Sequence, residues 1–185
     1  ILMVAKVVLD EGVNLGWIEH NPAAGVKPVK VKTEQRLPWT ETDVERIYEI
    51  AHPRERLAIE LCINTGQRIA DVLNIRWDQL KRSKLVIFIA QEKTNKALFV
   101  PFTERLCRAL DDADRHGEYI LSNKLTGEQL AYTGIEQAIT KLRKKLGIKK
   151  TIHDLRHTAA HRLAAATKGE IDLIASITGH TNSAM

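Results

Sequence analysis

The sequence has few cysteines and few aromatic residues: it contains Cys62, Cys107 and an aromatic fraction of 5% among 185 residues. Both cysteines fall at apolar positions of segments with helical periodicity, which indicates buried free thiols in a reducing compartment rather than a disulfide. It also lacks a secretory signal and any hydrophobic run long enough to cross a membrane, since Lys6 interrupts the apolar stretch from Ile1 to Leu9. We therefore expect a cytoplasmic protein.

Internal repeats and low-complexity segments are absent as well. The length suits one main domain with a hydrophobic core, and a hydrophobic content of 44% is ordinary for a globular protein. The net charge of +5 favours a polyanionic partner, although many proteins that bind no nucleic acid carry a similar excess. Charge alone therefore does not identify a function.

The chain is predicted to contain three segments. Residues 1–24 begin with a helical pattern that no capping residue precedes, and we interpret them as the remnant of an earlier helical domain. Residues 25–36 are rich in proline and lysine, which disfavours a helix and predicts an extended basic linker. Residues 37–185 form the main domain.

The main domain is predicted to be mostly helical with a small antiparallel sheet, an α+β fold. A capping-box pattern at Thr40–Asp43 starts one helix, and Pro53 starts another that ends at Thr65-Gly66. Residues 85–89 and 98–101 are rich in β-branched and aromatic side chains and predict a hairpin. Further helices are expected at residues 103–116, at 133–146 with a second capping box from Thr133 to Glu136, at 153–167 and at 170–178.

Four short motifs carry residues suited to one chemistry: Thr65-Gly66-Gln67-Arg68, Glu92-Lys93-Thr94, His153-Asp154-Leu155-Arg156-His157 and Ile177-Thr178-Gly179-His180. Transesterification of a phosphodiester places extra negative charge on the non-bridging oxygens, and fixed cationic donors lower that barrier. Guanidinium groups stay charged and offer paired donors that match phosphate oxygens. Arg68 and Arg156 are therefore predicted to clamp the phosphate.

In this order and at these separations, the motifs resemble the tyrosine recombinase (phage integrase) family, and the resemblance covers the chain from about Leu37. It implies the catalytic-domain fold of that family and a site-specific recombinase that cuts and rejoins DNA through a 3′-phosphotyrosine, without a metal or cofactor. In that family the tyrosine nucleophile follows the Gly-His motif by about nine residues. The sequence stops at Met185, before that position, so we expect this chain to bind DNA without cleaving it.

The departing 5′ oxygen must receive a proton. Lys93 is the predicted general acid, because a lysine on a hairpin near two arginines has a lowered pKa and because the Lys-Thr pair after a strand matches the family. Lys96 lies three residues away and could compete for this role.

The remaining residues of the predicted site surround the two arginines. His153 shares a helix face with Arg156, where it could contact the phosphate or accept the proton of the nucleophile. His180 could donate a hydrogen bond to a non-bridging oxygen. Asp71, one helical turn after Arg68, could hold that guanidinium in place, and His157 is expected to pack or hydrogen-bond within the fold.

Each motif taken alone has a simpler interpretation. A single arginine of a basic protein is usually a surface residue, and Lys93–Lys96 alone is typical of a solvated turn. His153, His157 and His161 have a spacing that could bind zinc, but no cysteine or fourth ligand lies nearby in sequence, so we predict no metal site.

The partner implied by the resemblance is double-stranded DNA, bound by the full-length protein as a homotetramer, with DNA-bending accessory proteins as further partners. We expect this chain alone to be a monomer. Lysines and an arginine that by default form solvated faces are predicted to track the DNA backbone: Lys27, Lys30, Lys32, Lys141, Arg143, Lys144, Lys145, Lys149 and Lys150. The alternative function is a non-catalytic architectural or regulatory DNA-binding module.

Overall fold

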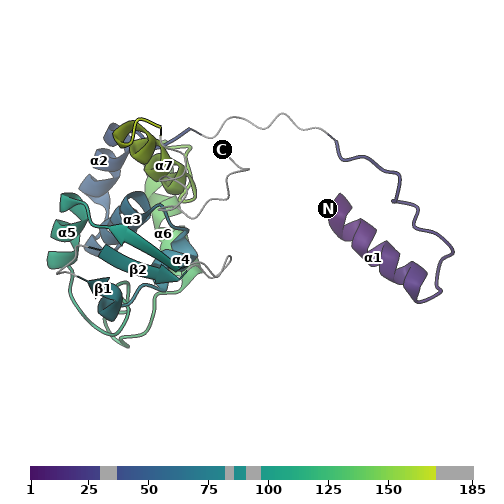
Figure 1. Ribbon diagram of the computed structural model, residues 1–185, viewed down its shortest axis with the longest axis horizontal. Coiled ribbons are helices and arrows are strands. Elements are labelled where there is room, and N and C mark those ends of the chain that lie inside the picture. Colours follow the sequence, from purple (N-terminus) through teal and green to yellow (C-terminus); the bar gives the residue numbers. More distant parts are fainter. Residues whose placement is uncertain (30–36, 82–85, 91–96, 170–185) are drawn as a thin grey trace. The chain divides into compact units, whose positions relative to one another are not determined.

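The computed structural model describes residues 1–29, 37–81, 86–90 and 97–169 (Figure 1). The chain divides into two compact units, Ile1–Gln35 and Arg36–Met185. The first unit contains α1 (Leu2–Asn14) and a following loop, in which the Asn21 amide donates hydrogen bonds to the backbone of Lys6 and to Asp10. The assignment of residues 1–24 to an earlier helical domain and of residues 25–36 to a linker stays a prediction.

The second unit begins with two helices whose ends follow the sequence closely. The N-cap of α2 (Glu41–Ile50) is Thr40, whose hydroxyl accepts a bond from the Asp43 amide while the Asp43 carboxylate accepts one from the Thr40 amide. Pro53 opens α3 (Pro53–Thr65), and Gly66 ends it with φ of 65°, a left-handed conformation that glycine adopts without strain. The capping box at Thr40 and the helix end at Gly66 are confirmed.

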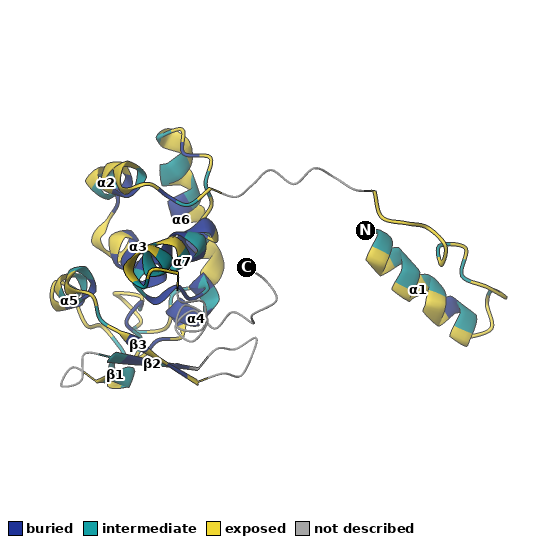
Figure 2. Ribbon diagram, turned by 45° about the horizontal axis from the view of Figure 1, so that its top comes forward, coloured by how far each residue is buried: buried dark blue, intermediate teal, exposed yellow. Residues whose placement is uncertain are grey.

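A three-stranded antiparallel sheet, in the order β1-β2-β3, lies beside the helices. The strands are β1 (Leu80–Lys81), β2 (Val86–Ala90) and β3 (Ala97–Pro101), and β2 and β3 form the predicted hairpin with Phe88 opposite Phe99. Helices cover one face of this sheet, as Figure 2 shows, and there Ile87 and Val100 are fully buried. Phe99 lies on the opposite face of the sheet and is 66% exposed.

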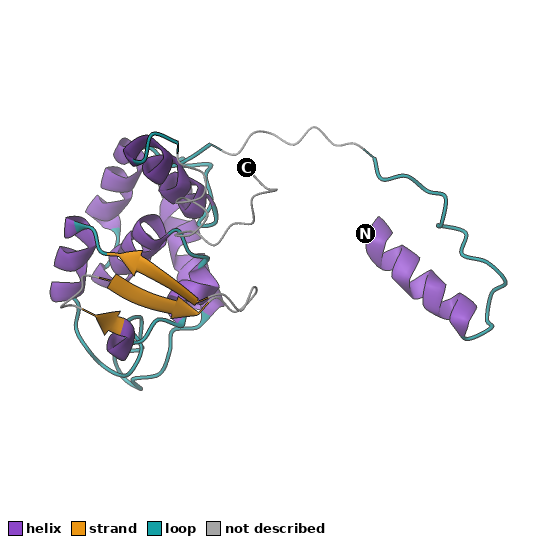
Figure 3. Cartoon of the chain, in the orientation of Figure 1, coloured by secondary structure: helices purple, strands orange, loops and turns teal. Residues whose placement is uncertain are grey.

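The remaining helical elements are α4 (Ile69–Leu73), the 3-10 turn η1 (Trp77–Gln79), α5 (Glu104–Asp111), α6 (Tyr132–Lys145) and α7 (Asp154–Ala166) (Figure 3). The central helix is α3, which packs against α4, α5, α6 and α7 and is buried over most of its length. A mostly helical fold with a small antiparallel sheet is therefore confirmed. The sequence pattern did not reveal α4, η1 or β1.

Two predicted helix boundaries are wrong. The helix expected to reach His116 ends at Asp111. The chain that follows is extended because it pairs with residues near η1: the Trp77 N–H donates to the Glu118 carbonyl, and the Ile120 N–H donates to the Ile75 carbonyl. The second predicted capping box is also wrong, since α6 begins at Tyr132 after Ala131, with no side-chain cap. The helix expected at residues 170–178 lies outside the described residues.

Both cysteines are free thiols. Cys62 is buried in α3, where burial raises the pKa of its thiol to about 12, whereas Cys107 on α5 is only half-buried. Within the described part of the chain, no helix combines the length and the apolar character that a membrane span requires.

Candidate functional site

The break between α3 and α4 sets the position of Arg68. Gly66 turns the chain out of α3, and Gln67, which is 1% exposed, fills the turn and donates a side-chain hydrogen bond to the Thr65 carbonyl. Arg68 is then the N-cap of α4, with an extended backbone and a partly exposed side chain. The sequence Thr-Gly-Gln-Arg thus places an arginine at the edge of the core rather than on an open surface.

Arg156 reaches the same turn from α7. Its side chain is 3% exposed, and its Nη1 donates a hydrogen bond of 2.9 Å to the carbonyl oxygen of Gly66. Asp71 is also buried, and its Oδ2 lies 3.8 Å from Nη1 of Arg68. Three of the predicted site residues, Arg68, Asp71 and Arg156, therefore lie together although α7 is far from α4 in sequence.

Two guanidinium groups and one carboxylate leave this cluster with an excess of positive charge. Burial, and then repulsion from Arg68, lower the pKa of Arg156 to about 10, while the Asp71 carboxylate acts in the opposite direction. At neutral pH Arg156 still carries its proton, so the lowered pKa reflects first the cost of burying this charge and then the cost of holding it close to Arg68. An anion bound between them would relieve that cost, which makes the cluster a candidate phosphate site.

The two histidines of the third motif lie at the start of α7. His153 is the N-cap and is exposed, and its ring meets the half-buried ring of His157 edge to face, with centroids 5.8 Å apart. His161, one turn further along, is exposed. Among the described residues, no group of three or more His, Cys, Asp or Glu side chains is placed to hold a metal ion.

Several predicted site residues lie outside the described residues: Lys93 and His180 of the predicted catalytic set, Lys96, and Lys30 and Lys32 of the basic linker. The strands β2 and β3 that flank residues 91–96 are described, and they pair up to Ala90 and Ala97. Lys93 therefore belongs to the segment that connects these two strands.

The basic residues around α6 fall into two groups. Arg143 donates to the carbonyls of Ile148 and Lys149, and Lys150 forms an ion pair with Asp43, so these two side chains have partners within the fold. The others project into solvent, as does Lys27 in the first unit: Lys141, Lys144, Lys145 and Lys149. The exposed group is better placed to meet a polyanion.

The three tyrosines of the sequence have other environments. The Tyr48 hydroxyl donates to Glu60, and burial together with that carboxylate raises the pKa of Tyr48 well above its ordinary value. Tyr119 lies under the guanidinium of Arg76, and Tyr132 is exposed at the start of α6. The structure thus places each tyrosine in contacts that involve neither Arg68 nor Arg156.

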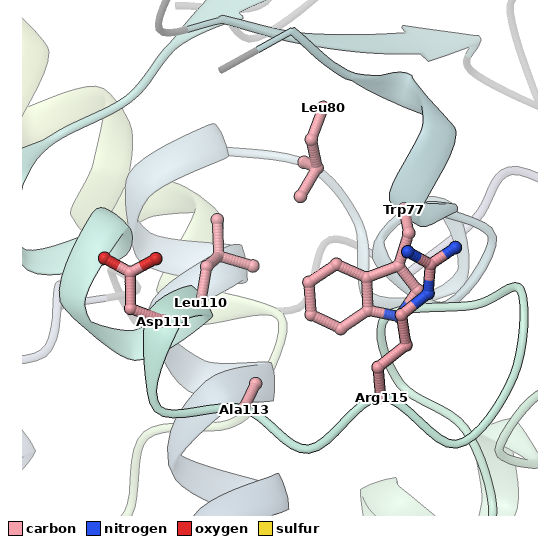
Figure 4. Close-up of a pocket in the computed structure, with 6 residues that line it drawn as sticks. All are labelled: Trp77, Leu80, Leu110, Asp111, Ala113 and Arg115. Carbon is pink, nitrogen blue, oxygen red and sulfur yellow. The ribbon is translucent and has the colours of Figure 1, made fainter.

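Two surface hollows are present elsewhere in the second unit. One, of about 430 Å³, is lined by Trp77, Leu80, Leu110, Asp111, Ala113 and Arg115, with the Arg115 guanidinium over the indole ring (Figure 4). The other, of about 920 Å³, lies beside the first half of α3 and includes Tyr48, Glu60 and Arg105. Neither Arg68 nor Arg156 lines these hollows, so the candidate site is the cationic cluster rather than a deep pocket.

Residues 39–185 match the Phage integrase family, which is most of the chain, and the chain therefore belongs to that family. Its relatives include tyrosine recombinase XerC of Leptospira interrogans, 28% identical over 194 residues that cover 96% of this chain and 60% of XerC. The integrase of Escherichia phage HK022 is 30% identical over 99 residues, which are 52% of this chain and 27% of that integrase. The chain spans about three fifths of the length of the tyrosine recombinases that it matches.

The fold is shared with lambda integrase. The chain matches one chain of a lambda integrase dimer bound to a COC′ core site, with a TM-score of 0.82 and 24% identity, over 100% of this chain and 71% of that one. Together with the family match, this similarity confirms the predicted catalytic-domain fold.

Some residues that shape the site were not found from the sequence. The Gly66 carbonyl, which accepts the bond from Arg156, was predicted only as a helix end. Trp39, which is 3% exposed, was not singled out at all. It donates hydrogen bonds to Thr158 in α7 and to the carbonyl of Thr151 before that helix. A tryptophan directly before a capping box was the available signal, since a large side chain at that position commonly packs against the helix that follows or a neighbour.

Proposed function

We propose that this chain is the catalytic part of a tyrosine-type site-specific DNA recombinase, which cuts and rejoins DNA by transesterification. One observation carries the proposal: Arg68 and Arg156, from motifs 88 residues apart, lie at one turn with a buried carboxylate and a surplus of positive charge. The family relationship supplies the chemical context, because relatives in this family are named tyrosine recombinases and integrases.

In the proposed reaction the two guanidinium groups hold the non-bridging oxygens of the scissile phosphate and stabilise the charge that develops on them. A tyrosine oxygen attacks phosphorus, the bond from phosphorus to the 5′ oxygen breaks, and a 3′-phosphotyrosine forms. Asp71 keeps Arg68 in place through its carboxylate, which lies 3.8 Å from Nη1.

Protons must move in the same step. Lys93 is proposed to protonate the departing 5′ oxygen, and His153, exposed at the start of α7, is proposed to contact the phosphate or accept the proton of the tyrosine. His180 is proposed to donate to a non-bridging oxygen, and His157 to orient His153 through their edge-to-face contact. These roles rest on the motifs and on the family relationship.

The proposed substrate is double-stranded DNA, and the activity is proposed to act in the cytoplasm. Solved integrase relatives are dimers on a core site and tetramers on a Holliday junction, which supports a tetramer on DNA for the full-length protein. A monomer is proposed for this chain alone. Accessory DNA-bending proteins are proposed as further partners. The exposed lysines Lys141, Lys144, Lys145 and Lys149, with Lys27, Lys30 and Lys32, are proposed to contact phosphates along the duplex.

Covalent trapping tests the proposal. Nicked duplexes with a randomised core, from which a cleaved strand diffuses away, are incubated with this chain and with a version extended by the downstream codons of its gene. The extended version should give a protein–DNA adduct on a denaturing gel if those codons supply a tyrosine, and the 185-residue chain should bind without an adduct.

Two outcomes would contradict the proposal. DNA binding without any adduct in a tyrosine-containing extended version would favour a non-catalytic DNA-binding module. An adduct formed by the 185-residue chain would mean that Tyr48, Tyr119 or Tyr132 reaches the phosphate, against the contacts that the structure gives them.

A further inference from the structure

Residues near the start of the second unit are joined to α7 and to the segment directly before it. The backbone N–H of Trp39 donates to Oγ1 of Thr158 at 2.8 Å, and its indole Nε1 donates to the carbonyl of Thr151 at 2.9 Å. Glu41 forms an ion pair with Arg162, and Asp43 forms one with Lys150. We name Trp39, Glu41 and Asp43 the α7 brace.

The α7 brace forms hydrogen bonds on both sides of Arg156 in the sequence. Thr151 lies before α7 and Thr158 in its middle, so Arg156 lies between the two points that Trp39 holds. These points are joined further through Asp154, whose carboxylate accepts from Thr151 and whose carbonyl accepts from Thr158. A shift of Trp39 would therefore change the position of the first turns of α7.

That position decides whether Arg156 reaches its acceptor. The hydrogen bond from Arg156 Nη1 to the Gly66 carbonyl crosses from α7 to the end of α3, and it places the guanidinium close enough to Arg68 for repulsion between them. Preorganised charge-stabilising groups lose much of their effect when they are displaced by a fraction of an ångström.

We propose that Trp39 is a positioning residue for Arg156: through Thr151 and Thr158 it holds α7 in the register that lets Arg156 and Arg68 share one anion. This inference rests on the proposed function of the cationic cluster. It assigns a role to a residue near the start of the second unit, two positions before α2.

The Trp39 and Thr158 contacts can be removed separately with little change in shape. Trp39→Phe keeps an aromatic ring but loses the indole N–H, and Thr158→Val keeps the volume but loses the hydroxyl, whereas Thr158→Ser restores a hydroxyl. Trp17→Phe is the matched control for the tryptophan, because Trp17 is 78% exposed in the first unit. Leu110→Ala in α5 is the control for stability, because it opens a cavity in the core.

Two readouts on the 185-residue chain distinguish positioning from simple destabilisation, both at a temperature where every variant is folded by circular dichroism. The first is hydrogen exchange of the Arg156 guanidinium protons, followed by NMR. The second is the dissociation constant for inorganic phosphate, followed through the same resonances. Trp39→Phe and Thr158→Val should each speed the exchange and weaken phosphate binding about fivefold, the scale of one lost hydrogen bond.

Thr158→Ser should recover most of the effect, and Trp17→Phe and Leu110→Ala should leave both readouts within about twofold of the parent. The proposal is overturned if Leu110→Ala changes the exchange as much as Thr158→Val does, or if neither Trp39→Phe nor Thr158→Val changes it. Faster exchange in a protein that binds no phosphate would support the positioning role while contradicting the proposed function of the cationic cluster.

Discussion

Two charged clusters pack against α3, and they differ in how their charges are balanced. The cationic cluster at the end of the helix contains Arg68, Asp71 and Arg156. The second, which we name the compensated cluster, contains Tyr48, Glu60 and Arg105: Glu60 accepts from the Tyr48 hydroxyl and from Arg105 Nε, and the Arg105 guanidinium lies 5.0 Å from the centroid of the Tyr48 ring.

The pKa values of the arginines in the two clusters shift in opposite directions. Burial and then Arg68 lower the pKa of Arg156, whereas for Arg105 the attraction of Glu60 and Tyr48 outweighs partial burial and raises the pKa. A charge that faces an opposite charge serves stability, while a buried charge that faces a like charge favours the binding of an anion. The comparison therefore distinguishes Arg105, whose charge Glu60 compensates, from Arg156, which we propose binds an anion together with Arg68.

The largest expected effect is on cleavage. In a version of the protein that forms the covalent adduct, Arg156→Ala should slow cleavage at least about a hundredfold, the scale seen when one preorganised charge-stabilising donor is lost. Single-turnover cleavage of a nicked duplex measures this rate. Arg105→Ala is the control, and it should leave the rate within about threefold at temperatures where the variant is folded. Equal losses in the two variants would erase the distinction between the clusters.

The next largest expected effect is on stability, where Arg105→Ala should cause a greater loss than Arg156→Ala. Arg105→Ala should lower the free energy of unfolding by about 2 kcal/mol, because Glu60 is 3% exposed and would lose its cation, although the partial exposure of Arg105 limits the loss. Arg156→Ala should cost less, since it also removes the repulsion with Arg68. Urea denaturation of the two variants tests the order, and a larger loss for Arg156→Ala would contradict the charge balance of the two clusters.

The sequence predicted the helices that begin and end at strong local signals, such as Thr40, Pro53 and Gly66, because capping and left-handed turns depend on a few neighbouring residues. It failed where tertiary pairing decides the outcome. The segment after Asp111 has a helical pattern, yet it is extended because Glu118 and Ile120 pair with the chain near Trp77 and Ile75. Short elements such as α4 and β1 have too few residues for a periodic signal.

The candidate site shows the same division. Residue types and motif order were enough to propose that Arg68, Asp71 and Arg156 act together, and the structure brings these three together. The sequence could not show that Lys150 has an internal partner in Asp43, since both its charge and its neighbours resemble those of the exposed lysines. The Gly66 carbonyl was missed because a backbone acceptor leaves no local pattern, and the position of Trp39 before a capping box indicated local packing but not its contact with the distant Thr151.

Anion binding should also distinguish the two clusters, with a smaller expected change in the free energy of unfolding. Sulfate at ten times its dissociation constant should stabilise the parent by about 1.4 kcal/mol, because ligand binding to the folded state adds directly to stability. Arg68→Ala should abolish the stabilisation that comes from sulfate binding, whereas Arg105→Ala should keep it. Thermal unfolding in sulfate and in chloride at equal ionic strength measures the difference, since sulfate also stabilises proteins nonspecifically. Equal sulfate responses in both variants would place the anion elsewhere.

The two groups of basic residues around α6 should differ in DNA binding. Replacing Lys144 and Lys145 by Ala should flatten the slope of log Kd against log salt by about one unit for each phosphate that the variant no longer neutralises. Lys150→Ala should leave the slope unchanged, because Lys150 is bound to Asp43 within the fold. Fluorescence anisotropy at several salt concentrations tests both, and a flatter slope for Lys150→Ala would mean that this lysine binds DNA after all.

The smallest expected effect is the pH dependence of the contribution that Lys150 makes to the free energy of unfolding. Burial alone would raise the pKa of Asp43, but hydrogen bonds from Lys150 and Thr40 outweigh it and hold the pKa below the ordinary value of 3.8. A carboxyl with a lowered pKa stabilises the folded state above its unfolded pKa, and this contribution is lost as the pH falls through the folded pKa. Lys150→Ala should therefore cost about 1 kcal/mol at neutral pH and almost nothing once Asp43 is protonated, well below pH 3.8. Urea denaturation of parent and variant between neutral and acidic pH measures the difference, with Lys149→Ala as the exposed control. A cost that stays constant across this range would mean that Lys150 stabilises the fold through the packing of its side chain and not through its charge.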